Sequence, residues 1–207
     1  MPLLHWSPRS PYVRKVLIAL HEKGLADQVT RVRTLVDPLV PLQAFLATNP
    51  LSKIPTLELE DGRVLFDSHV ICRWADQTGD AGPRLFPSDL IAERDEALGT
   101  GLIDVALLWL VEARLRPQPL RSDAMMTSYR IKMNAVCDWL ELHVAALRNR
   151  PFDIGHVSIG VALSYLDFRF EAEAWRNGRP ELAAWHDDFC KRESVRSTQF
   201  QDEVRPA

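Results

Sequence analysis

The sequence contains few cysteines, and they stand far apart. Its 207 residues include three, Cys72, Cys137 and Cys190, each within a segment of helical apolar spacing. An odd number of separated cysteines supplies neither a disulfide framework nor the close pairs of a zinc site. The six histidines also lack metal-ligand spacing. We therefore expect reduced, buried thiols and no metal.

The sequence also lacks a concentration of one charge and a long hydrophobic run. Lys and Arg number 25 against 28 Asp and Glu, for a net charge of −3, and no stretch gathers the basic residues that bind nucleic-acid phosphates. No apolar run reaches the roughly 20 residues that span a bilayer, and the amino terminus does not resemble a secretion signal. We expect a cytoplasmic protein with no nucleic-acid or membrane partner.

Up to about residue 78, short β-like runs alternate with segments of helical spacing. In chain order these are strand 3–6, helix 11–23, strand 29–35, a short helix 42–48, strands 54–59 and 63–66, and a helix that starts at Asp67 or Ser68. Between the last two strands, Asp61-Gly62 is typical of a hairpin turn. The order β-α-β-α-β-β-α predicts an α/β domain with a small mixed sheet and helices on its faces.

The rest of the chain shows no strand signal. Residues 79–88 are rich in Gly and Pro and predict a linker. Helical spacing then covers 91–114, 124–147, 157–168 and 181–191, followed by a polar tail from Glu193. The stretch 157–168 is apolar on nearly all faces and should be a buried central helix. We divide the chain into an α/β domain of residues 1–78, a linker of 79–88 and an all-α domain of 89–207.

The start of the first predicted helix carries two serines, in the stretch Ser-Pro-Arg-Ser-Pro-Tyr of residues 7–12. Ser10 suits the N-cap, and Pro11 suits the first helical position. The unpaired N–H groups and the dipole of a helix start attract anions, so a hydroxyl there can help to hold a thiolate, carboxylate or phosphate. The alternative is that Ser10 only caps the helix.

Two more features follow in the same half of the chain. Lys53-Ile54-Pro55 enters a strand, and Asp67-Ser68 opens a helix. Each has an ordinary explanation, because proline is permitted at the first residue of a strand and Asp-Ser is a common helix cap. The combination of these two features with the serine-containing helix start, at these distances in the sequence, is a much more specific indication of function than any one feature alone.

Together these features resemble the cytosolic glutathione S-transferase family, whose members join a thioredoxin-like domain to an all-α domain. The stretch 10–24 is similar to the first helix of the serine-type members, with a tau- or zeta-like motif, and suggests a bacterial member. The stretches 152–157 and 162–169 are similar to the capped, buried helix of the second domain. The resemblance covers essentially the whole chain, and it implies a homodimer and glutathione as co-substrate.

The resemblance also assigns roles in binding glutathione. It implies that the Pro55 peptide is cis and that the backbone of Ile54 pairs with the cysteinyl part of glutathione. Asp67 and Ser68 would grip the γ-glutamyl end. Lys53 is the remaining candidate for the glycyl carboxylate.

Several positions depart from the family pattern. Trp6 stands where other members carry a catalytic tyrosine, and residues 1–71 contain no cysteine for mixed-disulfide chemistry. The loop 35–45 has no basic residue for the glycyl carboxylate. In the second domain the helix cap is Asp153, and His156 stands where the family usually has an acidic residue. That pair still satisfies the helix start if Asp153 accepts from the His156 backbone.

The implied reaction requires a thiolate, because a thiol has a reference pKa of about 8.5. We expect the Ser10 hydroxyl to donate a hydrogen bond to the sulfur, which then attacks an electrophile or a peroxide in an apolar pocket. Ser7 is the competing donor, but it precedes Pro8 and lies farther from the first helical turn. The pocket residues inferred from family position are Arg9, Tyr12, Leu108 and Trp109, and Trp109 could instead belong to the core.

Two other functions stay open. One is a glutathione-dependent cis-trans isomerase of the zeta-like kind. The other is a non-enzymatic binding or scaffold protein that keeps the fold without the chemistry, since fold does not determine function. The incomplete set of residues for the glycyl end of glutathione favours this last alternative.

Overall fold

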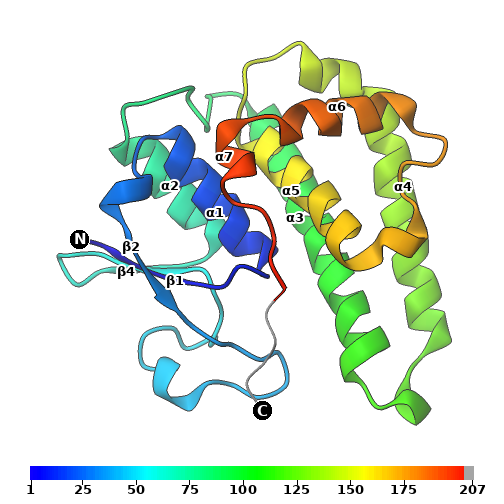
Figure 1. Ribbon diagram of the computed structural model, residues 1–207, viewed down its shortest axis with the longest axis horizontal. Helices are drawn as coiled ribbons and strands as arrows, with labels where there is room; N and C mark the ends of the chain where they lie inside the picture. Colours follow the sequence, from blue (N-terminus) through cyan, green and yellow to red (C-terminus); the bar gives the residue numbers. More distant parts are fainter. Residues whose placement is uncertain (203–207) are drawn as a thin grey trace. The chain divides into compact units, whose positions relative to one another are not determined.

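The computed structural model describes residues 1–202 and divides into two compact units. The first contains Met1–Ser88 and also takes up the chain from Glu193 onward, and the second is Asp89–Arg192. The first unit is a mixed sheet with helices, and the second is helical (Figure 1). The predicted fold class, an α/β thioredoxin-like part followed by an all-α part, is confirmed.

A four-stranded sheet forms the centre of the first unit. Its strands are β1 (Leu3–Trp6), β2 (Thr30–Arg33), β3 (Thr56–Glu58) and β4 (Val64–Leu65), in the spatial order β2-β1-β3-β4. β1 runs parallel to β2, while β3 is antiparallel to both β1 and β4. This arrangement follows from the connections, because a helix joins the parallel pair and a hairpin joins β3 to β4.

Two helices accompany this sheet and pack against each other, α1 (Pro11–Glu22) and α2 (Ser68–Thr78). Leu4 and Leu57, paired across β1 and β3, are fully buried, as are Val16 of α1 and Ile71 of α2. Alternate strand residues point to one face of a sheet, so these positions form one apolar layer between sheet and helices. The helices are thereby held with their first turns next to the strand ends that precede them.

The segment between β2 and β3 departs from the prediction of a short helix over 42–48. It contains the 3₁₀ turn Gln43–Phe45; another 3₁₀ turn, Ala26–Gln28, lies before β2. The Leu42 N–H is accepted by the Ser52 hydroxyl at 3.0 Å, and Pro50 lacks the N–H that a longer helix would require. The predicted short helix is therefore present only as one 3₁₀ turn.

The second unit is built from long helices. They are α3 (Leu90–Leu110), α4 (Asp123–Arg148), α5 (Ile154–Phe170) and α6 (Pro180–Cys190), with one π-helical turn (Val111–Leu115) and 3₁₀ turns at Gln118–Leu120 and Glu171–Glu173. Every residue of α5 up to Leu166 is buried, and the helix packs most extensively on α3. The central buried helix is confirmed, although it begins three residues earlier than predicted.

Glycines let α5 approach its neighbours closely. A Cβ on Gly99 of α3 would lie 2.5 Å from the backbone of Ser158, and one on Gly160 would lie 2.4 Å from the Phe189 ring. The Ser158 hydroxyl donates to the Glu96 carbonyl at 2.9 Å, so the buried side chain is satisfied across the same contact. These contacts fix α5 at the centre of the helical unit.

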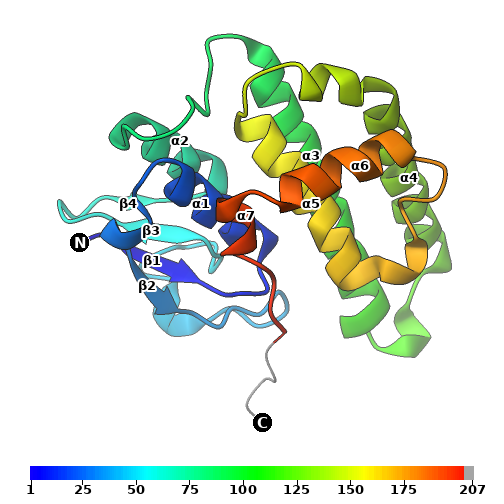
Figure 2. The same ribbon diagram turned by 45° about the horizontal axis from the view of Figure 1, so that its top comes forward.

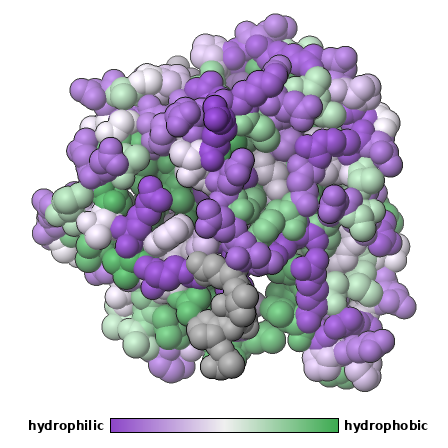
Figure 3. Space-filling view, viewed as in Figure 1, coloured by the Kyte–Doolittle hydropathy of each residue, from purple (hydrophilic) through white to green (hydrophobic). Residues whose placement is uncertain are grey.

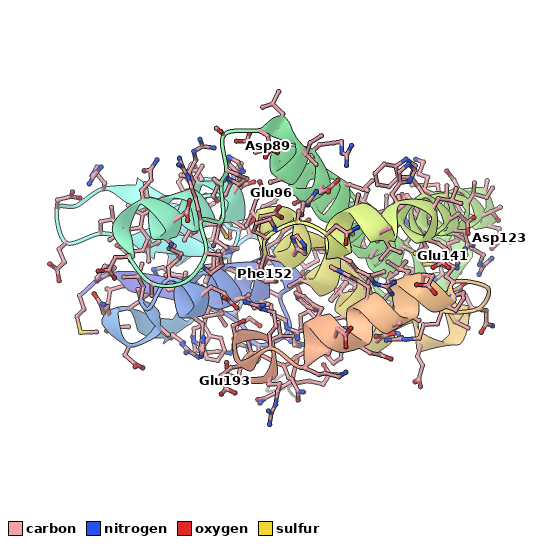
Figure 4. All side chains as sticks on the ribbon, turned by 90° about the horizontal axis from the view of Figure 1, so that it is seen from above. Asp89, Glu96, Asp123, Glu141, Phe152 and Glu193 are labelled. Carbon is pink, nitrogen blue, oxygen red and sulfur yellow. The ribbon has the colours of Figure 1, made fainter. Side chains whose placement is uncertain are left out.

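The carboxyl-terminal segment also differs from the prediction, which placed a polar tail on the helical domain. The short helix α7 (Glu193–Arg196), labelled at Glu193 in Figure 4, belongs to the first unit and packs on α1. Ser194 and Val195 are each 1% exposed. The domain division has to be corrected here, because burial of Val195 against α1 outweighs the polar composition around it.

The surface of the described residues mixes polar and apolar side chains, as the face in Figure 3 shows. The loop after β2 carries several exposed apolar side chains, namely Leu35, Leu39, Val40, Leu42 and Leu51. Within residues 1–202, no helix combines the length and the apolar character needed to cross a membrane.

Candidate functional site

The strand register of the first unit brings three of the predicted segments to one edge of the sheet. His5 of β1 pairs with Thr56 of β3, so the chain after β1 and the chain before β3 meet at that edge. Leu57 pairs with Leu65 of β4, which brings the chain after β4 to the same place. Residues 7–10, 53–55 and 67–68 are therefore neighbours in space, although up to about 60 residues separate them in sequence.

Two helices also begin at this edge. Ser10 is the N-cap of α1, and its hydroxyl oxygen accepts the Val13 N–H at 3.3 Å. Asp67 is the N-cap of α2, and its carboxylate accepts the His69 N–H at 3.0 Å. The positive ends of two helix dipoles and their unpaired N–H groups favour negative charge nearby. The edge is thus suited to an anion or to a ligand with several anionic groups.

The loop that carries both serines is tightly folded. The Ser10 N–H donates to the Ser7 carbonyl at 3.2 Å, and the Ser7 hydroxyl oxygen accepts the Arg9 N–H at 3.4 Å. Ser7 is 7% exposed, while Ser10 is half-buried. In both of these serine contacts the hydroxyl is the acceptor, so its own proton is available for donation. Ser10 has a proton that it can donate, and it also lies at the start of α1.

The Ile54–Pro55 peptide bond is cis, as the family resemblance implied. Ile54 is 8% exposed, and within residues 1–202 neither its N–H nor its C=O takes part in a hydrogen bond of the protein. Buried backbone groups are almost always paired, with protein, water or ligand. The backbone of Ile54 is therefore well suited to bind a peptide-like ligand at this edge.

Two buried side chains that the sequence did not reveal hold this cis turn. Asn49, 1% exposed, donates from Nδ2 to the Lys53 carbonyl at 3.0 Å and to the Thr56 hydroxyl at 2.9 Å. Thr56 in turn donates to the Lys53 carbonyl at 2.9 Å. The Asn49-Pro50 pair was the available signal, because Asn before Pro commonly starts a turn. The network fixes the backbone from which Ile54 projects.

The remaining predicted glutathione residues differ in exposure. Asp67 is exposed and uses Oδ1 for the cap, so Oδ2 can accept from a ligand ammonium. Ser68 is 2% exposed at the first turn of α2. Lys53 is exposed on the loop before the cis peptide.

One further cation lies at this edge and was not anticipated. Arg33, at the end of β2, donates from Nη1 to the carbonyls of Trp6 at 3.1 Å and Thr34 at 3.2 Å. These carbonyls lie at the carboxyl ends of the parallel strands β1 and β2. Arg33 therefore adds positive charge next to the serine loop.

The four residues predicted for an electrophile pocket lie two in each unit and differ in exposure. Arg9 and Tyr12 are half-buried in the first unit, and Leu108 is 55% exposed on α3. Trp109 is 4% exposed, and its ring packs on Phe170 with centroids 4.8 Å apart. The geometry of Trp109 agrees with the core alternative within the helical unit.

The three cysteines differ in burial. Cys72 and Cys137 are buried and Cys190 is half-buried, and none of the three forms a disulfide within residues 1–202. Desolvation by burial raises the pKa of the Cys137 thiol to about 12. Across the described part of the chain, no group of three or more His, Cys, Asp or Glu side chains is placed to hold a metal ion.

Comparison with known proteins agrees with this geometry. Residues 9–78 match the model of the glutathione S-transferase N-terminal domain. The uncharacterized GST-like protein YibF of Escherichia coli K12 is 31% identical over 196 residues, covering 92% of this chain and 94% of YibF. The chain belongs to the glutathione S-transferase family.

Solved structures of other family members extend the comparison over both units. A glutathione transferase family member from Pseudomonas fluorescens Pf-5, with bound glutathione, is 36% identical with a TM-score of 0.92, and the match covers 98% of this chain and all of that one. A second structure from this organism contains S-(propanoic acid)-glutathione and matches with 35% identity and a TM-score of 0.87, over 97% of this chain and 100% of that one. These family members bind glutathione or a derivative substituted on its sulfur.

Proposed function

We propose that the protein is a serine-type glutathione transferase in which the Ser10 hydroxyl stabilises the glutathione thiolate. The observation that carries the proposal is the meeting of residues 7–10, 53–55 and 67–68 at one sheet edge, where α1 and α2 both begin. This edge offers a hydroxyl for the sulfur, a free backbone for the peptide, and a carboxylate for the ammonium. These are the groups that a γ-glutamyl tripeptide requires.

In the proposed mechanism, Ser10 acts as a hydrogen-bond donor and neither as a nucleophile nor as a base. Its oxygen already accepts the Val13 N–H, so its proton points away from that bond and can be donated to sulfur. A hydrogen bond to a charged group is worth about 1.5–3 kcal/mol, which corresponds to about one to two units of thiol pKa. The α1 dipole acts in the same direction.

The rest of glutathione would bind along the same edge. The Ile54 N–H and C=O would pair with the cysteinyl backbone, and the cis Pro55 peptide sets their direction. Asp67 would accept from the γ-glutamyl ammonium, and Ser68 would bind its carboxylate. Lys53 is the proposed contact for the glycyl carboxylate.

The thiolate would attack a small electrophile, forming a C–S bond while the leaving group departs with its electron pair. With a peroxide, it would form an S–O bond as the O–O bond breaks and the alcohol leaves, and a second glutathione thiol would then displace water to give glutathione disulfide. A relative of 35% identity binds S-(propanoic acid)-glutathione, in which an organic group is attached to the glutathione sulfur. A compound of this kind is what sulfur transfer to carbon produces, and this supports conjugation as the reaction. The cytoplasmic location and the homodimer remain proposals that rest on the family.

The test compares Ser10→Ala with Ser7→Ala in the full chain. Ser10→Ala should raise the pKa of the bound glutathione thiol by about one unit or more and reduce turnover, while the dissociation constant for glutathione stays nearly unchanged. The thiolate absorbance in the ultraviolet, followed against pH, measures the first effect, and calorimetry measures the second. Ser7→Ala is the control and should leave the thiol pKa close to that of the wild type.

Other outcomes would support other functions. Unchanged turnover in Ser10→Ala with a loss in Ser7→Ala would transfer the donor role to Ser7. No glutathione binding at millimolar concentration would favour the scaffold alternative. Turnover of a maleyl-type keto acid, without turnover of a chloronitrobenzene, would favour the isomerase.

A further inference from the structure

The returning carboxyl-terminal segment reaches the loop that carries Ser10. After α7 the chain runs along α1, as Figures 1 and 2 both show, and the Gln201 N–H donates to the Pro8 carbonyl at 3.3 Å. The neighbouring Phe200 ring lies under the Arg14 guanidinium, 4.6 Å from its carbon to the ring centroid. Two consecutive residues thus contact the chain before and after Ser10: Gln201 contacts Pro8, and Phe200 contacts Arg14.

These contacts form a closed cycle of residues that includes Ser10. The Ser10 carbonyl accepts the Arg14 N–H at 3.0 Å, and the Ser10 N–H donates to the Ser7 carbonyl at 3.2 Å. The cycle runs from Ser10 to Arg14, then to Phe200, Gln201 and Pro8, and from Pro8 along the chain back to Ser10. The loop is therefore held at Ser10 by the helix cap and at Pro8 by the carboxyl-terminal segment, whereas the cap alone would hold it only at Ser10.

The segment is anchored independently at its other end. The Ser194 hydroxyl donates to Glu22 Oε1 at 2.5 Å, and the Val195 carbonyl accepts from Arg14 Nη2 at 3.3 Å. Arg14 is 5% exposed, and a guanidinium over an aromatic face is attracted to the ring more strongly where water is excluded. Arg14 therefore links the anchor at α7 to the contact at Phe200.

We infer that Phe200 is a positioning residue for the Ser10 hydroxyl: through Arg14 and Pro8, the segment 193–202 holds the serine loop in the geometry that stabilises the glutathione thiolate. This inference rests on the proposed function of Ser10. A hydrogen bond weakens steeply as its angle departs from linear. A more mobile loop would therefore raise the pKa of the glutathione thiol, and a small displacement would do so without loss of glutathione binding. Phe200 does not need to touch glutathione for this effect.

The test uses two substitutions of the same residue in the full chain. Phe200→Leu keeps an apolar side chain but removes the ring face, and Phe200→Tyr keeps the ring. We expect Phe200→Leu to raise the pKa of bound glutathione by about half a unit, a threefold loss of thiolate at a pH well below that pKa, with a matching loss in kcat. The KM for glutathione should change less than kcat, and Phe200→Tyr should restore wild-type values.

Ser194→Ala supplies the matched control on the same segment. It removes the bond to Glu22, which lies 12 residues along α1 from Ser10, or about 18 Å at the rise of an α-helix. It should lower the melting temperature without moving the thiol pKa. A Phe200→Leu variant that loses stability but keeps the wild-type thiol pKa would overturn the inference and leave the role of Ser10 intact. Absence of a thiolate band in the wild type with glutathione would overturn both.

Discussion

Removal of the Asp153 carboxylate should destabilise the helical unit more than the loss of an ordinary helix cap. Asp153 is the N-cap of α5 and is 4% exposed. Its carboxylate accepts the His156 N–H at 3.1 Å, and His156 Nδ1 accepts the Asp153 N–H at 3.2 Å, which completes a reciprocal capping box. Arg150 Nε lies 2.8 Å from Asp153 Oδ2.

The expected magnitude follows from these contacts. Loss of an N-cap costs about 1 kcal/mol. Breaking a buried ion pair costs about 3–5 kcal/mol, but Arg150 keeps a second partner, Asp95, at 2.7 Å, so we take about 2 kcal/mol for this part. Asp153→Ala should therefore reduce the free energy of unfolding by about 3 kcal/mol. Asp153→Asn, which retains a good cap, should lose only about 2 kcal/mol.

Urea unfolding followed by far-ultraviolet circular dichroism measures both variants at neutral pH. Asp89, labelled in Figure 4, is the control because it caps α3 through a single bond to the Ile91 N–H at 2.9 Å. Asp89→Ala should cost about 1 kcal/mol. If Asp153→Ala costs no more than Asp89→Ala, the ion-pair part of the reasoning is refuted.

The dependence on pH gives a second check. Burial opposes ionisation of Asp153, but its hydrogen-bonded contact with His156 and the charge of Arg150 outweigh it and hold its pKa below the usual 3.8. A lowered carboxyl pKa stabilises the fold above the unfolded-state pKa, and this contribution is lost as pH falls through the folded-state value. The difference between wild type and Asp153→Asn should be full at neutral pH and shrink below about pH 4. A difference that grows on acidification would contradict the assigned ion pairs.

Two further predictions concern buried positions. A thiol reagent applied to the native protein near pH 8 should label Cys190 and leave Cys137 unlabelled, because burial raises the pKa of Cys137 to about 12; native labelling that drops in Cys137→Ser would contradict this. Gly160→Ala should cost about 1–3 kcal/mol, since its Cβ would meet the Phe189 ring at 2.4 Å, whereas Gly101→Ala, with nothing within 4 Å, should gain up to about 1 kcal/mol. Equal unfolding midpoints for the two glycine variants would show that the ring moves aside.

Local signals predicted much of the first unit. The caps at Ser10 and Asp67 are seen where they were expected, because each depends on residues adjacent in sequence. The Pro55 peptide is cis, as the family resemblance implied. The Asp153 and His156 pair was likewise readable, since a capping box spans only three positions. The features of the first unit position most of the candidate site.

Features that depend on distant residues could not be predicted in the same way. Phe200 is a single apolar residue in a polar stretch, and nothing near it in sequence indicates its contact with Arg14. Arg33 resembles any charged residue at a strand end until β1 is placed beside it. Asn49 resembles a turn residue, and its role at the cis peptide follows only from the folded loop.

The return of the chain to the first unit has a consequence for biosynthesis. Residues 1–88 leave the ribosome before residues 193–202, so the part of α1 that Val195 and Phe200 cover stays open until that later segment has been made. The first unit therefore completes its packing only after the helical unit has been translated in full. A fragment ending at Ser88 would expose apolar surface that the intact chain hides, and expression of this unit alone would require residues 193–202 to be joined to it.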